Sequence, residues 1–144
     1  MARYLGIDFG TKRIGVAVSD ELGLTAQPLP TLEPSADEAA VHAVRGLIRE
    51  YDVIEIVMGL PKNMNGTLGP AAERVLAFAR QLEESVPVKV TMWDERLTSL
   101  AAERLLIEAD LSRAKRKRRV DQMAALLILQ GFLDHCRRQQ ERTS

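Results

Sequence analysis

Three acidic residues lie far apart along the chain, and each is placed beside an expected sheet by a predicted strand or helix. Asp8 lies within the first apolar segment, Glu95 follows the last apolar strand, and Asp121 opens the last apolar helix. Carboxylates that folding brings together repel one another, so such a cluster is costly unless a cation neutralises it. Carboxylate oxygens suit Mg²⁺ or Mn²⁺, and two such ions can activate water and stabilise the leaving oxygen of a phosphodiester. The three acids are therefore candidate metal ligands and catalytic residues.

Each acid also has a simpler interpretation. Asp121 could complement the positive end of its helix, and Glu95 could form a surface ion pair with Arg96. Asp94 could be the functional acid instead, because strand alternation puts Asp94 and Glu95 on opposite faces of the sheet without showing which face holds Asp8. The residues by themselves leave this choice open.

A basic segment directly precedes Asp121: six of the seven residues from Arg113 to Arg119 are Lys or Arg. Lys and Arg contacts to phosphates supply most of the sequence-independent affinity for nucleic acid, and a cation beside a scissile phosphate can stabilise developing charge. Lys12 and Arg13, at the tip of the first expected hairpin, could act in the same way. The alternative is an ordinary solvated loop.

The first segment, residues 4–20, must position Asp8. Apolar residues alternate with others on either side of a Gly-Thr-Lys break, which predicts two strands joined in a hairpin. Asp8 shares its face with Gly6 and Gly10, and the second strand adds small residues to the same face. Such a surface would let a metal or a phosphate backbone approach closely. A solvated Asp on an edge hairpin fits the same pattern.

The rest of the chain consists of alternating strand and helix patterns. Pro28 and Pro30 cannot donate to a ladder, so residues 24–32 are expected to form a third strand at a sheet edge. A capping-box pattern at Ser35 and Glu38 precedes the first helix. The expected elements are then a helix over about 36–51, a strand over 53–58, a loop over 62–69, a helix over 70–84, a strand over 86–93, a helix from 98 or 99 to about 109, a basic loop over 112–119 and a final helix over about 120–138. Three antiparallel strands followed by two parallel ones predict an α/β fold with a mixed sheet covered by helices.

The composition limits the kinds of protein that this chain can be. With 144 residues, 46% of them apolar, the chain is expected to form one domain over residues 1–144. Lys plus Arg and Asp plus Glu both number 20, so the net charge is zero and only the distribution of charge can point to nucleic acid. Cys136 is the single cysteine, so no internal disulfide forms, and no Cys/His set has zinc-site spacing. Without a membrane-spanning run or a signal-peptide pattern, the chain is expected to be soluble and cytoplasmic.

Four segments of the sequence carry a family resemblance. They are residues 6–20, Gly59-Leu-Pro61 with Gly66, Asp94-Glu-Arg-Leu-Thr98, and Ser112 to Ala125. In this order and over nearly the whole chain, they resemble the YqgF/RuvX family, described as Holliday-junction-resolvase-like proteins and as nucleases that mature the 5′ end of pre-16S ribosomal RNA. The resemblance implies an RNase H-like fold. It also implies a metal-dependent nuclease that uses the first-strand Asp, the Glu of Asp-Glu-Arg and the Asp before the Ala-Ala pair, which here are Asp8, Glu95 and Asp121.

The resulting prediction is a phosphodiester hydrolase that acts on structured RNA, in first place a ribosomal RNA precursor, with Mg²⁺ or Mn²⁺ held by the three acids. The cations expected to bind phosphates are Lys12, Arg13, Arg96, Arg113, Lys115, Arg116, Lys117, Arg118 and Arg119. A DNA junction resolvase would apply the same chemistry to branched DNA, and a non-catalytic nucleic-acid-binding module would use the acids to hold a structural ion. A nucleotide phosphotransferase would need a second lobe, for which the chain is too short. The chain is expected to be a monomer or a weak homodimer with no membrane partner.

Overall fold

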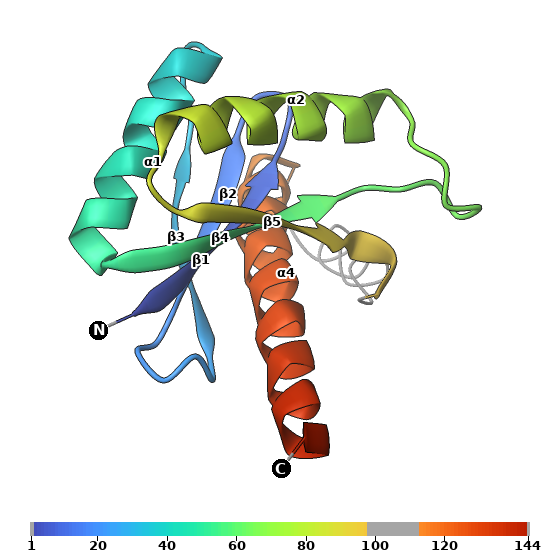
Figure 1. Cartoon of the computed structure of the whole chain (residues 1–144). Helices are drawn as coiled ribbons and strands as arrows, with labels where there is room; N and C mark the ends of the chain where they lie inside the picture. Colours follow the sequence, from blue (N-terminus) through green and yellow to red (C-terminus); the bar gives the residue numbers. More distant parts are fainter. Residues whose placement is uncertain (1, 98–112, 144) are drawn as a thin grey trace.

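The chain folds into a five-stranded sheet with helices on both faces (Figure 1). The computed structural model describes residues 2–97 and 113–143, with the backbone alone for 113–122 and 143. The helix predicted from 98 or 99 to about 109, and the first residue of the predicted basic loop, Ser112, therefore lie outside the described residues.

The sheet has the mixed topology that the sequence predicts. Its strands are β1 (Arg3–Phe9), β2 (Ile14–Ser19), β3 (Ala26–Leu32), β4 (Val53–Leu60) and β5 (Lys89–Asp94). They are ordered β3-β2-β1-β4-β5. The β1–β2 and β2–β3 pairs are antiparallel, whereas β4 runs parallel to both β1 and β5. β3, which contains Pro28 and Pro30, is an edge strand as expected, while β4 ends at Leu60 rather than at residue 58 and β5 begins at Lys89 rather than at residue 86.

Alternation along the strands divides the apolar residues between two cores. The helical elements are α1 (Asp37–Tyr51), α2 (Pro70–Ser85), the 3-10 turn η1 (Glu95–Leu97) and α4 (Arg113–Thr143). Leu5 and Ile7 belong to the core shared with α1 and α2, and Ala17 and Val57 belong to the core shared with α4. Figure 1 shows α1 and α2 on one side of the sheet and α4 on the other. Residues that alternate with Leu5 and Ile7 in β1 therefore face α4.

α4 begins earlier and ends later than predicted. The basic segment 113–119, predicted as a loop, is helical, because α4 starts at Arg113 rather than near residue 120 and continues to Thr143. Lys, Arg and Ala are strong helix formers, and neither Gly nor Pro interrupts the chain between Arg113 and Asp121. A helix nucleated where α4 packs on the sheet can therefore propagate through the charged segment. Neither α4 nor any other helix in the described ranges has an apolar stretch long enough to cross a bilayer.

The start of α1 also differs from the prediction. The residue before the helix is Ala36, and no side chain caps the first turn, so the capping box predicted at Ser35 and Glu38 is wrong. Asp37 and Glu38 instead lie in the first turn, where acidic side chains complement the positive end of the helix. Asp52 ends the helix in the left-handed conformation, with φ 52°.

Asp20 organises the turn between β2 and β3. Its Oδ1 accepts hydrogen bonds from the backbone N–H groups of Leu24 at 2.8 Å and Thr25 at 3.4 Å, and its Oδ2 accepts one from the Thr25 hydroxyl at 3.3 Å. The bond from Leu24 contributes most, and together with those from Thr25 and Gly23 it holds the pKa of Asp20 below its ordinary value.

The lowered pKa predicts a pH-dependent contribution to stability. Asp20 stabilises the fold fully above the ordinary Asp pKa of about 3.9, and this contribution is lost as the pH falls through the lower pKa of the folded state. We expect Asp20→Asn to lower the free energy of unfolding in urea at pH 7 and to have little effect at pH 2. Glu50→Gln, an exposed change on α1, is the control. An equal loss for Asp20→Asn at both pH values would contradict the assignment.

Candidate active site

Asp8 lies near the end of β1, on the face of the sheet that α4 covers. Alternation places it with Gly6, where an added Cβ would lie 2.7 Å from Leu129 Cβ and 3.0 Å from the carbonyl oxygen of Ala125, both in α4. On the neighbouring strand Asp8 pairs with Gly15. The half-buried Asp8 is thus surrounded by residues without side chains, as the sequence pattern predicts.

Glu95 reaches the same face from the end of β5. It is the first residue of η1, and its Oε1 lies 3.0 Å from the position that a Cβ would occupy on Gly59 in β4. That oxygen is buried. Ile128 of α4 lies against the same position on Gly59, and Trp93, two residues before Glu95, belongs to the core under α4. Gly59 therefore leaves the space in which the Glu95 carboxylate lies.

Asp94 is directed elsewhere and is bound by cations. It aligns with Leu60, which belongs to the core shared with α1 and α2. Arg96 Nη2 donates to Asp94 Oδ2 at 2.8 Å, and Arg96 Nε donates to both carboxylate oxygens at 3.1 Å. Lys62 Nζ lies 4.0 Å from Asp94 Oδ2. The hydrogen bonds from the Arg96 side chain hold the pKa of Asp94 below its ordinary range and raise the pKa of Arg96. Of the two neighbouring acids, Glu95 is the one on the side of the sheet that faces α4.

α4 runs alongside β1 in the direction of the candidate site. The ring centroids of Tyr4 and Phe132 lie 5.7 Å apart, and further along β1 Gly6 lies against Ala125. Residues nearer the end of β1 therefore contact residues nearer the start of α4.

Asp121 lies one turn before Ala125, in the direction of the end of β1 that carries Asp8. α4 begins at Arg113, eight residues earlier, and the effect of the helix dipole is confined to the first turn. Complementing the helix end therefore does not account for Asp121. Ala125 and Ile128, which follow Asp121 at helical spacing, are fully buried, so this stripe of α4 faces the sheet where side chains are described. The side chain of Asp121 itself lies outside the described residues.

The donors present are of the kind that a hard divalent cation takes. Asp8 and Glu95 supply carboxylate oxygens on one face of the sheet, near the carboxyl ends of β1 and β5, where open α/β sheets bind ligands. Among the side chains that the structure describes, no three His, Cys, Asp or Glu residues converge on one point. Asp121, the third expected ligand, is not among those side chains.

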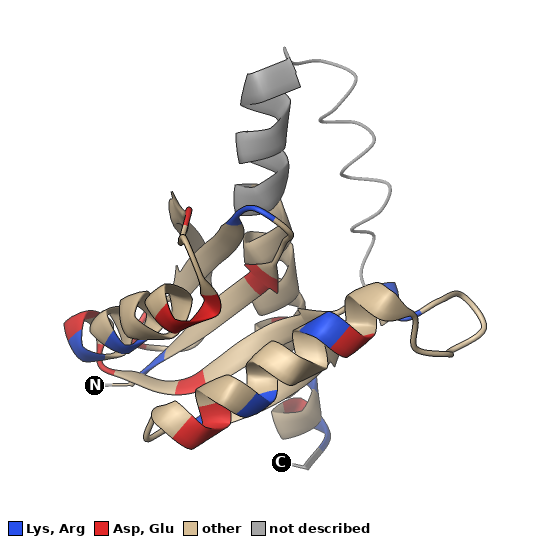
Figure 2. Ribbon diagram, turned by 90° about the horizontal axis from the view of Figure 1, so that it is seen from above, with Lys and Arg blue, Asp and Glu red and all other residues tan. Residues whose placement is uncertain are grey.

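The cations predicted to bind phosphate have different surroundings. Lys12 is exposed at the β1–β2 turn, whereas Arg13 Nε forms an ion pair with Glu33 Oε1 at 3.1 Å. Arg96 is bound to Asp94. The six cations of residues 113–119 lie on the first turns of α4. Figure 2 shows that charged residues are carried mainly by helices and loops, while the strands are mostly uncharged.

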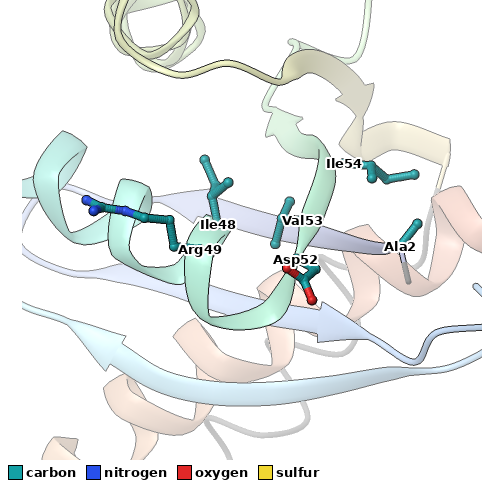
Figure 3. A pocket seen from close by; sticks show the side chains of 6 residues that line it. All are labelled: Ala2, Ile48, Arg49, Asp52, Val53 and Ile54. Carbon is teal, nitrogen blue, oxygen red and sulfur yellow. The ribbon is translucent and has the colours of Figure 1, made fainter.

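A hollow at the opposite end of the sheet offers no comparable chemistry. It is lined by Ala2, Ile48, Arg49, Asp52, Val53 and Ile54 (Figure 3). These residues surround the start of β4, whereas Asp8 and Glu95 lie near strand ends. The lining contains a single carboxylate, that of Asp52, so the hollow does not provide the paired acids that a catalytic divalent cation requires.

Gly59 is the feature of the site that the sequence prediction missed. The sequence indicates only that a buried strand stops near Gly59. The sequence pattern could have revealed it. Strand alternation puts Gly59 on the same face as Val57 and on the opposite face from Met58, in the same way that it puts Asp8 on the face of Gly6. A glycine at that place in a buried strand indicates close approach by another group, which here is the Glu95 carboxylate together with Ile128.

Known proteins share both the sequence pattern and the architecture. The family model described as "RuvX: Holliday junction resolvase" matches residues 2–135. A protein of Bacillus thuringiensis (strain Al Hakam) named "Putative pre-16S rRNA nuclease" is 54% identical over 134 residues, which cover 92% of this chain and 98% of that protein. A protein of the same name from Bacillus anthracis (strain CDC 684 / NRRL 3495) matches with the same identity and coverage.

Solved structures show the fold. Thermus thermophilus RuvC in complex with a Holliday junction substrate has a TM-score of 0.60 at 18% identity, and the match covers 94% of this chain and 95% of that chain. The fowlpox virus Holliday junction resolvase has a TM-score of 0.51 at 14% identity, with 92% and 99% covered. The fold is the RNase H-like fold that the sequence resemblance implies. A shared fold does not by itself assign a substrate.

Proposed function

The chain belongs to the RuvX family and is a phosphodiester-hydrolysing nuclease, and from that premise we propose that it matures the 5′ end of pre-16S rRNA in the cytoplasm. Asp8, Glu95 and Asp121 would hold Mg²⁺ or Mn²⁺ and form the catalytic centre of one domain over residues 1–144. The name shared by the 54% identical relatives supports the RNA substrate.

The placement of Glu95 is the observation that carries this proposal. The carboxylate of an ordinary surface acid points into solvent. The Glu95 Oε1 is instead buried beside Gly59, on the face that also carries Asp8. Carboxylates that share one face repel each other, and a bound cation relieves that repulsion. Two strand-end acids on one face therefore support a site that binds divalent cations.

The residues of this chain would have separable roles in cleavage. Bound ions would supply an activated water and would stabilise charge on the leaving oxygen of the phosphodiester. Asp8 and Glu95 would hold these ions from the sheet, and Asp121 would hold them from α4. The apolar packing of Ile128 and Trp93 behind Glu95 excludes water from that side and strengthens electrostatic interactions at the acids.

The helical form of the basic segment supports a path for the nucleic acid. At a rise of about 1.5 Å per residue, Arg113 lies about 12 Å from Asp121 along the axis of α4. Six cations therefore extend from the level of the acids along one rigid element. Cations there, with Lys12 on the β1–β2 turn, would bind the phosphates that flank the cleaved bond.

A side-by-side cleavage assay tests the substrate and the metal together. The purified protein is incubated with a pre-16S rRNA fragment and, separately, with a four-way DNA junction, with Mg²⁺, with Mn²⁺ and with chelator. We expect cleavage of the RNA near the mature 5′ end, little cleavage of the junction, and loss of activity in chelator.

Two outcomes would contradict the proposal. Preferential and symmetric cleavage of the junction would replace the RNA substrate with branched DNA, and a dimer in solution would accompany it because a symmetric junction is cut by a symmetric enzyme. Binding of the RNA without cleavage under any metal would instead indicate a non-catalytic nucleic-acid-binding module.

A further inference from the structure

Arg96 connects two segments that border the candidate site. Its Nε and Nη2 donate to Asp94, at the end of β5, and its Nη1 donates to the carbonyl oxygen of Met64 at 3.3 Å. Met64 belongs to the β4–α2 loop, residues 61–69. Figure 1 shows this loop running out beyond the end of β4 before it returns to α2. One guanidinium therefore links the end of β5 to the loop.

The β4–α2 loop is itself a formed unit. The Asn63 N–H donates to the Thr67 carbonyl at 2.9 Å, and the Gly66 N–H donates to the Asn63 carbonyl at 2.8 Å. Asn65 Oδ1 accepts from the N–H and the hydroxyl of Thr67, at 3.1 and 2.6 Å. Gly66 has φ 87°, and a Cβ there would lie 3.4 Å from Arg96 Nη1. The loop is thus held together internally and rests on the guanidinium of Arg96.

Glu95 lies in the chain between Asp94 and Arg96, whose side chains bind each other. Besides the side-chain contacts, the backbone N–H of Arg96 donates to Asp94 Oδ1 at 2.9 Å. The Asp94 side chain therefore folds back over the peptide that follows Glu95, while the Glu95 carboxylate lies beside Gly59. A change in the pairing of Asp94 with Arg96 would alter the backbone that carries Glu95.

These contacts do not suit a side chain that clamps a substrate phosphate. The Nε, Nη1 and Nη2 atoms of Arg96 all donate to protein acceptors, and Asp94 offsets the charge. An exposed ion pair of this kind also adds little to overall stability. We propose that Arg96 is a positioning residue, which holds Glu95 and the β4–α2 loop in one arrangement for cleavage. The inference rests on the proposed function, and it replaces the phosphate-binding role expected for Arg96 from the sequence.

Three variants separate positioning from phosphate binding. Arg96→Lys keeps the positive charge but loses the planar guanidinium that contacts both Asp94 and Met64. Arg96→Ala removes the charge and the guanidinium together. We expect each to lower kcat for RNA cleavage about 10- to 100-fold, because small misplacements of catalytic groups have effects of this size. KM and its salt dependence should change little. Asp94→Ala should lower kcat similarly, and the double variant should be no worse than either single one.

A phosphate-binding Arg96 would behave differently. Arg96→Lys would then stay near wild-type activity, and Arg96→Ala would raise KM and reduce the salt slope of binding by about 1. Asp94→Ala would leave kcat unchanged. This pattern would overturn the positioning role. Arg137→Ala is the matched control, because Arg137 also pairs with an Asp, Asp134 at 3.0 Å, but near the other end of α4. Its kinetics should equal those of the wild type.

Hydrogen exchange tests the link without any substrate. In Arg96→Ala, the amides of Asn63 and Gly66 should exchange faster than in the wild type, because the loop loses its anchor. If the wild type cleaves RNA and these amides exchange equally fast in Arg96→Ala, the positioning role is overturned. If the wild type cleaves neither RNA nor DNA but these amides exchange faster in Arg96→Ala, the proposed function is overturned. The link between Arg96 and the loop would then still hold.

Discussion

Asp8→Asn is expected to reduce metal-dependent RNA cleavage about 10³-fold or more. Asn preserves the size of the side chain but removes the charge with which a carboxylate holds a hard divalent cation. Bound metal ions supply several kcal/mol of transition-state stabilisation, and each step of about 1.4 kcal/mol is a factor of ten in rate. Single-turnover cleavage at saturating protein measures the loss directly.

Asp52→Asn is the matched control for this substitution. Asp52 lies at the far end of the sheet with φ 52°, a conformation that Asn also adopts readily, so fold and activity should be unchanged. Thermal unfolding adds a readout besides activity. Mg²⁺ should raise the Tm of the wild type and of Asp52→Asn, because it binds the folded state, and should not raise that of Asp8→Asn. An Asp8→Asn variant that cleaves at the wild-type rate would remove Asp8 from the site.

The same assay distinguishes Glu95 from its neighbour. Glu95→Gln should match the loss in Asp8→Asn, since its carboxylate lies on the face that carries Asp8. Asp94→Asn should have a smaller effect and should leave the metal concentration for half-maximal activity unchanged, because Asp94 binds Arg96. A reversed order of the two effects would assign the second ligand to Asp94.

Local patterns were sufficient to predict the parts of the fold that depend on strand alternation. The alternation around Asp8 correctly predicts its glycine neighbours, and Pro28 and Pro30 correctly predict an edge strand. Each of these features depends on residues within a few positions of one another, because side-chain direction repeats every two residues in a strand.

The errors arose where packing at a distance decided the outcome. The high charge of the basic segment before Asp121 suggested a loop. The rest of α4 packs on the sheet, and the helix that forms there continues through the basic segment. The predicted capping box is wrong because the residue that precedes the helix is Ala36, which has no side-chain group to cap it, rather than Ser35. Hydrophobic burial of the α1 stripe stabilises that helix without the cap.

The choice between Asp94 and Glu95 could not be made from local pattern at all. It depends on the register of β4 with β5, which aligns Asp94 with Leu60, and on the space left by Gly59. The partner of Arg96 in the β4–α2 loop is likewise 32 residues away in the chain. Such contacts are set by the tertiary fold, so before the structure only the family resemblance favoured Glu95.

Gly6→Ala is expected to lower the free energy of unfolding by about 1–3 kcal/mol, the usual cost of overpacking a core. The added Cβ would lie 2.7 Å from Leu129 Cβ and 3.0 Å from the Ala125 carbonyl oxygen. Neither atom is the end of a flexible side chain, so α4 as a whole must move away from β1. Gly46→Ala is the control, because Gly46 lies in α1 with nothing within 4 Å of its added Cβ. There the substitution should stabilise the protein by about 0.5–1 kcal/mol through helix propensity.

The displacement of α4 should also reach the active site. Asp121 is one turn from Ala125, so a helix pushed off Gly6 carries Asp121 away from Asp8, and a misplacement of about 1 Å can reduce a rate about 10²-fold. We therefore expect Gly6→Ala to lose cleavage activity at temperatures where it remains folded, as measured by circular dichroism and cleavage on the same sample. Gly46→Ala should keep full activity. If Gly6→Ala were as stable and active as the wild type, β1 and α4 would not be packed closely enough for their acids to share metal ions.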